Sequence, residues 1–152
     1  MYNKRIIDSN RIFKSVLQIN GVIDCFVATL DGIPTGKVDR DSSIISATSA
    51  AILGAIGEMM RNLNFGMLEQ LIVETDFGRI VLEDVEDEYV IIVISEKNAN
   101  IGLIKVMLKK TLEKFKGELL SSKTESSHED HISKINDEIS NVSSAVQNLK
   151  DS

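Results

Sequence analysis

Apolar positions along the chain follow two periods, one typical of helices and one typical of strands. Near the N-terminus they recur at helical spacing, and we expect an amphipathic helix that ends at Gln18. Residues 21–37 form an apolar run that breaks at Asp31-Gly32, a pair that supplies the positive φ angles of a tight hairpin turn. Because Pro34 lacks a backbone N–H, the second strand of this hairpin, at residues 33–37, belongs at a sheet edge.

A long helix and three more strands are expected in the middle of the chain. Ser42 and Ser43 can cap the helix, which runs for about five turns to Leu63. The strand candidates are separated by short connections, so they form an antiparallel meander at residues 68–74, 79–85 and 89–94. The last of them, YVIIVI, is apolar at every position, which predicts a central strand covered on both faces in a three-layer arrangement.

The pattern predicts one α/β domain followed by an appendage. A further amphipathic helix begins near residues 100–102, which gives the order helix, two strands, helix, three strands, helix over residues 1–118. Residues 119–130 are rich in Ser, Lys and Glu without apolar periodicity, and we interpret them as a polar linker. A length of 152 residues with 43% hydrophobic content fits a single core.

The C-terminal segment, residues 131–150, carries a regular apolar stripe. Six residues follow one another at steps of 3, 4, 3, 4 and 3, which predicts an amphipathic heptad helix with the seam Ile132, Ile135, Ile139, Val142, Val146 and Leu149. A helix of this length is marginal alone in water, so the seam requires a partner surface. We expect it to dock on protein, because the segment has too few lysines for an anionic membrane.

The charge balance and the cysteine content exclude several classes of function. With 17 Lys and Arg against 23 Asp and Glu, the net charge of −6 argues against a nucleic-acid-binding protein. Cys25 is the single cysteine, so an intrachain disulfide is excluded, and we interpret it as a small buried apolar side chain in a reducing compartment. The apolar stretch at residues 43–57 is too short to span a bilayer. We expect a soluble, cytoplasmic protein.

No motif for catalysis or nucleotide binding stands out in the sequence. The phosphate loop GxxxxGK[ST] does not occur, so the chain is not itself a GTPase, and we expect no tight binding of GTP or ATP. We therefore nominate no catalytic residue, no metal ligand and no cofactor site, and we expect a protein that is not an enzyme.

Three segments, taken in order, resemble the roadblock/dynein light chain family. They are NGVIDCFVATLDGIP near the start, FGMLEQLIVETDFGRIVLEDV in the middle and NANIGLIKVMLKKTLEKF at the end, within residues 8–118. The resemblance implies an α/β/α sandwich on a five-stranded antiparallel sheet, with the second helix on one side and the first and last helices on the other. It also implies a homodimer joined through the third strands and the second helices, which acts as a scaffold or as a regulator of Ras-like small GTPases.

The residues themselves support dimerisation. An edge strand reading LEQLIVE, without Pro or Lys, is an aggregation hazard unless a second copy covers it, so the interface candidates are Leu68, Gln70, Ile72 and Glu74. The second helix carries small residues at three- and four-residue spacing that allow another backbone to approach, namely Ala47, Ala50, Ala51, Gly54 and Ala55. Close packing of this helix on its own sheet is the alternative explanation, and both can hold on different faces.

Two hypotheses of function follow from these features. The first is a homodimeric regulator that binds a Ras-like small GTPase, by stimulating GTP hydrolysis or as an effector. The second is a scaffold or adaptor that recruits other roadblock-type or helical partners to an intracellular assembly. For the tail seam, the choice of partner surface stays open between the other tail of a homodimer, the exterior of the domain, a GTPase and a lipid interface.

Overall fold

The computed structural model describes residues 8–36 and 38–150, without the side chains of Ser9 and of residues 122–129. The chain divides into two units, Met1–Glu113 and Lys114–Ser152. The first unit contains every strand that the described residues form, and the second contains the C-terminal part of the last helix. Each unit is described by itself.

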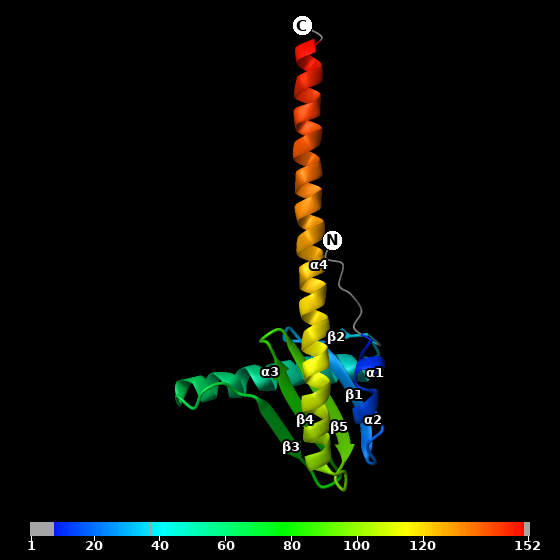
Figure 1. Cartoon of the computed structure of the whole chain (residues 1–152). Helices are drawn as coiled ribbons and strands as arrows, with labels where there is room; N and C mark the ends of the chain where they lie inside the picture. Colours follow the sequence, from blue (N-terminus) through cyan, green and yellow to red (C-terminus); the bar gives the residue numbers. More distant parts are fainter. Residues whose placement is uncertain (1–7, 37, 151–152) are drawn as a thin grey trace. The chain divides into compact units, whose positions relative to one another are not determined.

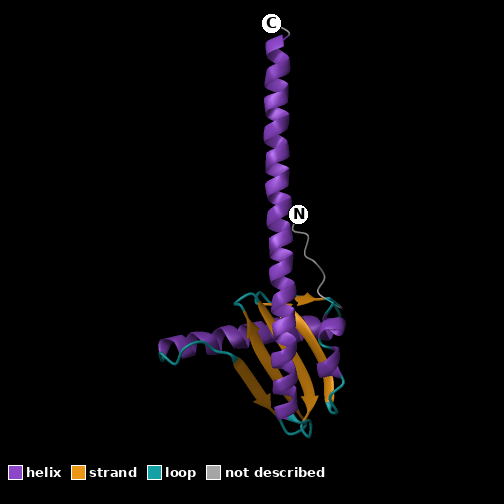
Figure 2. Cartoon of the chain, viewed as in Figure 1, coloured by secondary structure: helices purple, strands orange, loops and turns teal. Residues whose placement is uncertain are grey.

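The strands of the first unit form one five-stranded antiparallel sheet (Figure 2). Its order is β2-β1-β5-β4-β3, with β1 at Val22–Thr29, β2 at Pro34–Thr35, β3 at Gln70–Glu74, β4 at Gly78–Val85 and β5 at Tyr89–Glu96. The central place of β5 confirms the prediction made from its continuous apolar run, since the four residues from Val90 to Val93 are fully buried. The two edges of the sheet are therefore β2 and β3.

Helices cover both faces of the sheet and make three layers. Helix α3 (Arg40–Asn62) lies on one face, where Leu53 packs into a buried cluster with Ala28, Leu82, Val90 and Ile92. The first turns of α4 (Ile101–Lys150) cross the opposite face (Figure 1). The short helix α2 (Lys14–Leu17) lies beside α4, because the hydroxyls of Ser15 and Thr111 are 3.3 Å apart, within hydrogen-bonding distance. The predicted α/β/α sandwich is confirmed.

The N-terminal helix differs from the prediction of one continuous helix. The described part consists of α1 (Ser9–Ile12) and α2, separated by Phe13. Phe13 has φ −97° and ψ 16°, outside the α-helical region, and its side chain is fully buried. The break occurs at Phe13, which is as fully buried as Val16 in α2, so packing of Phe13 takes precedence over helix continuity. Residues 1–7, which the prediction also included, lie outside the described part.

The N-cap of helix α3 lies three residues before Ser42, the first of the two predicted caps. Asp39 is the N-cap: its carboxylate accepts a hydrogen bond from the backbone amide of Ser42 at 2.8 Å. The hydroxyl of Ser42 accepts in return from the amide of Asp39 at 3.0 Å, which completes a capping box. The prediction that Ser42 or Ser43 is the cap was wrong, because Ser42 occupies the third helical position of this box. The end is as expected, with Asn64 in the left-handed region at φ 54°.

Helix α4 runs without interruption from Ile101 to Lys150. The sequence analysis expected residues 119–130 to interrupt it as a polar linker, but the structure places them within the helix. The physical reason is that no Gly or Pro follows Gly117, so nothing in the segment breaks a helix even though it lacks an apolar stripe. The division into a domain at residues 1–118, a linker and a separate tail stays a prediction.

Candidate functional site at the β3 edge and helix α3

Strand β3 has one paired side and one open side. Its five residues pair with β4, with Ile72 opposite Val81 at the centre. The carbonyl of Glu69 accepts from an amide of β4 at 3.3 Å, and the amide of Thr75 donates to a β4 carbonyl at 2.9 Å. Residues of odd number therefore direct their backbone groups toward β4. Those of even number, Gln70, Ile72 and Glu74, direct theirs outward, and these are the residues that the sequence analysis nominated in this strand.

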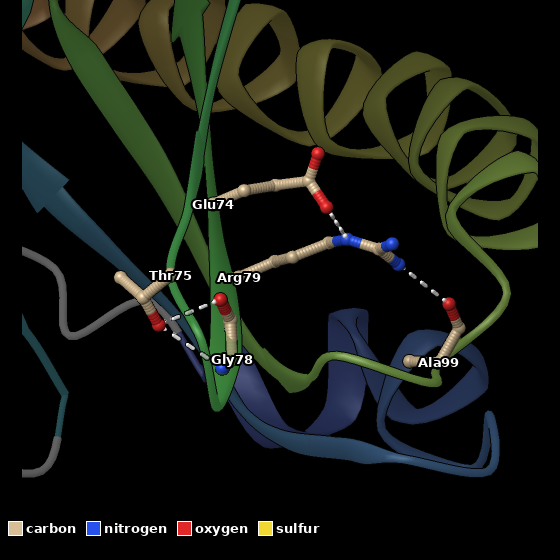
Figure 3. A network of polar contacts seen from close by, with 5 residues as sticks. All are labelled: Glu74, Thr75, Gly78, Arg79 and Ala99. Atoms are coloured by element: carbon tan, nitrogen blue, oxygen red, sulfur yellow. Dashed lines mark hydrogen bonds and ion pairs between the residues drawn. The ribbon is translucent and has the colours of Figure 1, made fainter.

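Glu74, at the C-terminal end of β3, is held by an ion pair with Arg79 of the same domain. Glu74 accepts a hydrogen bond from Arg79 Nε at 2.6 Å, and Arg79 Nη1 donates to the carbonyl oxygen of Ala99 at 3.0 Å (Figure 3). The hydrogen bond and positive charge of Arg79 lower the pKa of the Glu74 carboxyl, which therefore stays ionised at neutral pH. The pair ties the β3–β4 hairpin to the loop before α4.

The hairpin turn that joins β3 to β4 is also fixed by side-chain bonds. The hydroxyl of Thr75 donates to the carbonyl of Gly78 at 3.0 Å and accepts from its amide at 3.1 Å (Figure 3). At the other end of the strand, the side-chain amide of Gln70 donates a hydrogen bond to the side-chain carboxylate of Glu83 at 2.7 Å. With both ends held, the outward backbone groups of β3 are presented in a fixed, extended geometry.

Leu68 lies two residues before the observed start of β3, although the sequence placed it inside the strand. It is half-buried and packs against the core cluster on the α3 face of the sheet. Its side chain therefore contributes to the core of its own domain, and its part in an interface stays a prediction.

The small residues of α3 are divided between two sides of the helix. Ala50 is buried, together with Ser46, Ser49 and Leu53, and faces the sheet. The other nominated positions are exposed: Ala47, Ala51, Gly54 and Ala55. Packing on the helix's own sheet therefore explains Ala50, whereas a contact of the exposed side with a second copy stays a prediction.

The two glycines inside α3 are not explained by packing within the chain. A Cβ added at Gly54 or at Gly57 meets no heavy atom within 4 Å. Gly32, by contrast, needs its missing side chain, because a Cβ there would lie 2.8 Å from Cα of Ala47. A helical glycine costs about 1 kcal/mol relative to alanine. Gly54 and Gly57 therefore mark a face where something outside the chain can approach the helix backbone.

Large apolar side chains are also exposed on the second half of α3 and on the loop that follows it. The C-terminal end of α3 extends past β3, and the connecting loop returns to the sheet (Figure 1). Exposed residues gather on this end of the helix and on the loop, namely Ile52, Met59, Leu63, Phe65 and Met67. Phe65 and Met67 are 74% and 79% exposed, which is unusual for a loop without a partner. The sequence analysis missed these residues, although an aromatic residue inside the helix-ending turn was a usable signal.

Helix α3 is also long and apolar enough to qualify as a membrane span by length and composition. This corrects the expectation that its apolar stretch is too short, because the helix continues beyond residues 43–57. The finding is weak evidence for a membrane, since a core helix of a soluble domain meets the same criterion.

Other candidate chemistry is weaker than this surface. Burial raises the pKa of the Cys25 thiol well above its usual range, so the thiol stays protonated and acts as the small buried apolar group that the sequence predicted. Within residues 8–36 and 38–150, no group of three or more His, Cys, Asp or Glu is placed to hold a metal ion. The β3 edge and the open side of α3 are therefore the candidate functional site.

A sequence model of the Roadblock/LC7 domain matches residues 9–95, which is more than half of the chain. The chain belongs to the Roadblock/LC7 domain family. This confirms the resemblance found in the sequence. The chain is also similar to the uncharacterized protein MJ1340 of Methanocaldococcus jannaschii, which is 26% identical over 112 residues, covering 70% of this chain and 96% of the relative. MJ0310 of the same organism is 25% identical over 112 residues, with the same coverage.

Solved structures share the roadblock fold. A Roadblock/LC7 domain from Streptomyces avermitilis superposes with a TM-score of 0.67 at 11% identity, covering 73% of this chain and 97% of that one. MglB from Myxococcus xanthus gives 0.67 at 17% identity, with coverage of 80% and 94%. The gliding protein MglB from Thermus thermophilus gives 0.62 at 10% identity, with coverage of 74% and 89%. At these identities the likeness establishes the fold.

Proposed function

We propose that this roadblock protein is a cytoplasmic, non-enzymatic homodimer that regulates a Ras-like small GTPase. One observation carries the proposal: β3 presents an open, braced edge beside a helix whose two glycines face outward. An open edge strand is a ready template for pairing with another strand. The edge and the glycine face together fit a second copy of the same chain.

The register of β3 suits symmetric pairing. Two antiparallel copies centred on Ile72 place Gln70 of one chain opposite Glu74 of the other, so an amide faces a carboxylate and no like charges meet. All five residues of β3 are paired in this register. Any symmetric register that brings Glu74 opposite its own copy instead creates a repulsion. The sequence of the edge therefore favours one arrangement.

The GTPase partner is inferred from the family. Roadblock membership, together with the likeness to MglB, supports a regulator that acts on another protein. The chain lacks a phosphate loop, so in such a complex the nucleotide belongs to the GTPase. We expect this protein to order the catalytic residues of that GTPase or to bind its active form.

The test is the rate of phosphate release by Ras-like GTPases from the same genome, each purified and loaded with GTP. Adding the full chain should accelerate hydrolysis, or should produce GTP-dependent binding, for at least one of them. Ile72→Lys, which disrupts the edge, should weaken the effect. If every GTPase of the genome shows neither a changed rate nor binding, the regulatory function is wrong.

A scaffold role is the second candidate, and one observation favours it. Three relatives, at 26%, 25% and 24% identity, come from the single organism Methanocaldococcus jannaschii. Where one genome encodes several relatives of this chain, the open β3 edge can pair with one of them as well as with itself. Co-expression of two paralogues should then give a mixed dimer, whereas an exclusive homodimer argues for the regulator.

A further inference from the structure

The C-terminal half of α4 carries apolar side chains that the described chain leaves in solvent. The tail seam consists of Ile132, Ile135, Ile139, Val142, Val146 and Leu149, and its members are between 48% and 78% exposed. They lie on a continuous helix rather than on a disordered segment. Regular exposure of this kind indicates a surface that is covered in the assembled protein.

The spacing of the seam specifies a helical partner. Steps of 3 and 4 place Ile132, Ile139 and Val146 at the a positions of a heptad, and the other three at the d positions. This repeat of 3.5 residues is kept over three heptads, and it keeps one narrow stripe facing a supercoiled neighbour. A helix that packs on a globular surface instead shows a broader stripe, with an additional apolar position in each heptad.

The branching of the side chains indicates how many helices meet. Two of the three d positions hold β-branched residues, Ile135 and Val142. In parallel coiled coils, a two-stranded dimer favours Leu at d, whereas Ile at both a and d favours three or four strands. The first heptad, with Ile132 and Ile135, follows the second pattern. The second heptad also has a β-branched residue at d, Val142, and Leu149 is the one d residue that favours two strands.

The residues beside the seam permit identical helices to associate. In a parallel register the flanking g and e positions pair His131 with Asn136, Glu138 with Ser143, and Ala145 with Lys150, so no like charges face each other. Three of these six residues, Asn136, Ser143 and Ala145, are small and uncharged, which leaves room for more than one neighbour. The two lysines of residues 131–150 balance one Asp and one Glu, so the Lys, Asp and Glu side chains of several copies add no net charge.

We infer that four copies of the tail form a parallel four-stranded coiled coil that joins two roadblock dimers. The number four rests on the proposed dimer, because each dimer supplies two tails and a three-stranded assembly would leave one tail unpaired. The partner of the seam is thus a second dimer of the same chain. The assembly presents its roadblock domains as two dimers rather than one.

The experiment is the mass of the full chain by sedimentation equilibrium over a range of concentrations. The wild type should contain four chains. The double variant Ile135→Leu with Val142→Leu creates the two-stranded pattern and should contain two. The matched double variant Ile132→Leu with Ile139→Leu also replaces two β-branched residues by Leu, but at the a positions. Leu at a with Ile at d favours more than two strands, so this variant should keep four chains.

The remaining outcomes separate this inference from the proposed dimer. Ile139→Lys breaks the seam and should give two chains, while Ser140→Lys, on the outer side, should leave four. A wild type of two or three chains, or a Leu pair at d that keeps four, overturns the four-stranded tail. If Ile139→Lys gives single chains from a four-chain wild type, the tail assembly stands and the β3 dimer is wrong.

Discussion

The two edges of the sheet are built in opposite ways. Strand β2 is two residues long and begins with Pro34, and the hydroxyl of Thr35 donates to the carbonyl of Val27 at 3.0 Å. Further along β1, the amide of Cys25 donates to the carboxylate of its neighbour Asp24 at 2.8 Å. Strand β3 has five residues, no Pro and no Lys, and bracing at both ends.

The difference shows which edge the sequence protects against pairing. A short strand, a proline and a side chain that occupies a backbone amide are devices that keep an edge from adding strands. They gather at β1 and β2, while β3 has none of them and lies beside the exposed apolar end of α3. This contrast supports the proposed dimer through β3, and the predictions below test it.

The largest expected effect is loss of the dimer on changing Ile72 to Lys. The substitution places one charge from each chain at the centre of the pairing register, where the two copies of residue 72 meet. The mass should be measured in the Ile139→Lys background, so that the tail does not mask the result, and should fall from two chains to one.

The control lies at the protected edge. Ile23 on β1 is 63% exposed, and Ile23→Lys in the same background should leave two chains. Two chains for Ile72→Lys, or one chain for Ile23→Lys, contradicts the contrast between the edges.

A smaller effect is expected for Gly54→Ala, which should stabilise the monomer but weaken the dimer. In the background that carries both Ile72→Lys and Ile139→Lys, which should be monomeric, the change should stabilise α3 by about 1 kcal/mol, because alanine has the higher helix propensity and its Cβ meets nothing within 4 Å. In the dimer the same Cβ should weaken association by crowding the neighbouring helix. Thermal unfolding measures the first effect and the dimer dissociation constant the second.

Gly32→Ala is the matched comparison for this prediction. Gly32 has a φ of +85° and a Cβ there would lie 2.8 Å from Ala47 Cα, so this variant should destabilise the monomer. A Gly54→Ala protein that dimerises as tightly as the wild type excludes α3 from the interface.

Much of the fold followed from the sequence because local signals agreed with one another. The apolar run of β5 and the edge position of Pro34 each specified a local structure that the sheet satisfies. The Asp-Gly pair correctly marked the β1–β2 hairpin, but only Gly32 takes a positive φ, because the loop between Thr29 and Ile33 has three residues rather than two. The failures occurred where two signals competed. At Phe13 burial overrides helix periodicity, and Asp39 is a better cap than the serines that follow it.

The candidate site was predictable in part. Backbone groups alternate along an antiparallel strand, and the sequence analysis nominated the set Gln70, Ile72 and Glu74, whose backbone groups the structure directs outward. The rotation of α3 about its axis was not predictable, because small and apolar residues occur on almost every side of it. The sequence therefore did not separate Ala50, which packs on the sheet, from Gly54, which faces outward.

The smallest expected effect concerns the brace at the open edge. Arg79 lowers the pKa of Glu74 in the folded protein, so this carboxylate adds stability at neutral pH and loses that contribution as pH falls through the lowered pKa. Glu74→Gln should therefore lower the thermal midpoint slightly near neutral pH and match the wild type in strong acid. The side chain is solvent-exposed, so the difference should be small and should shrink with added salt.

The control is Arg79→Met, which removes the cation that pairs with Glu74 and should abolish the same pH dependence. A gap between wild type and Glu74→Gln that is equal at every pH would show that the ion pair does not brace the edge.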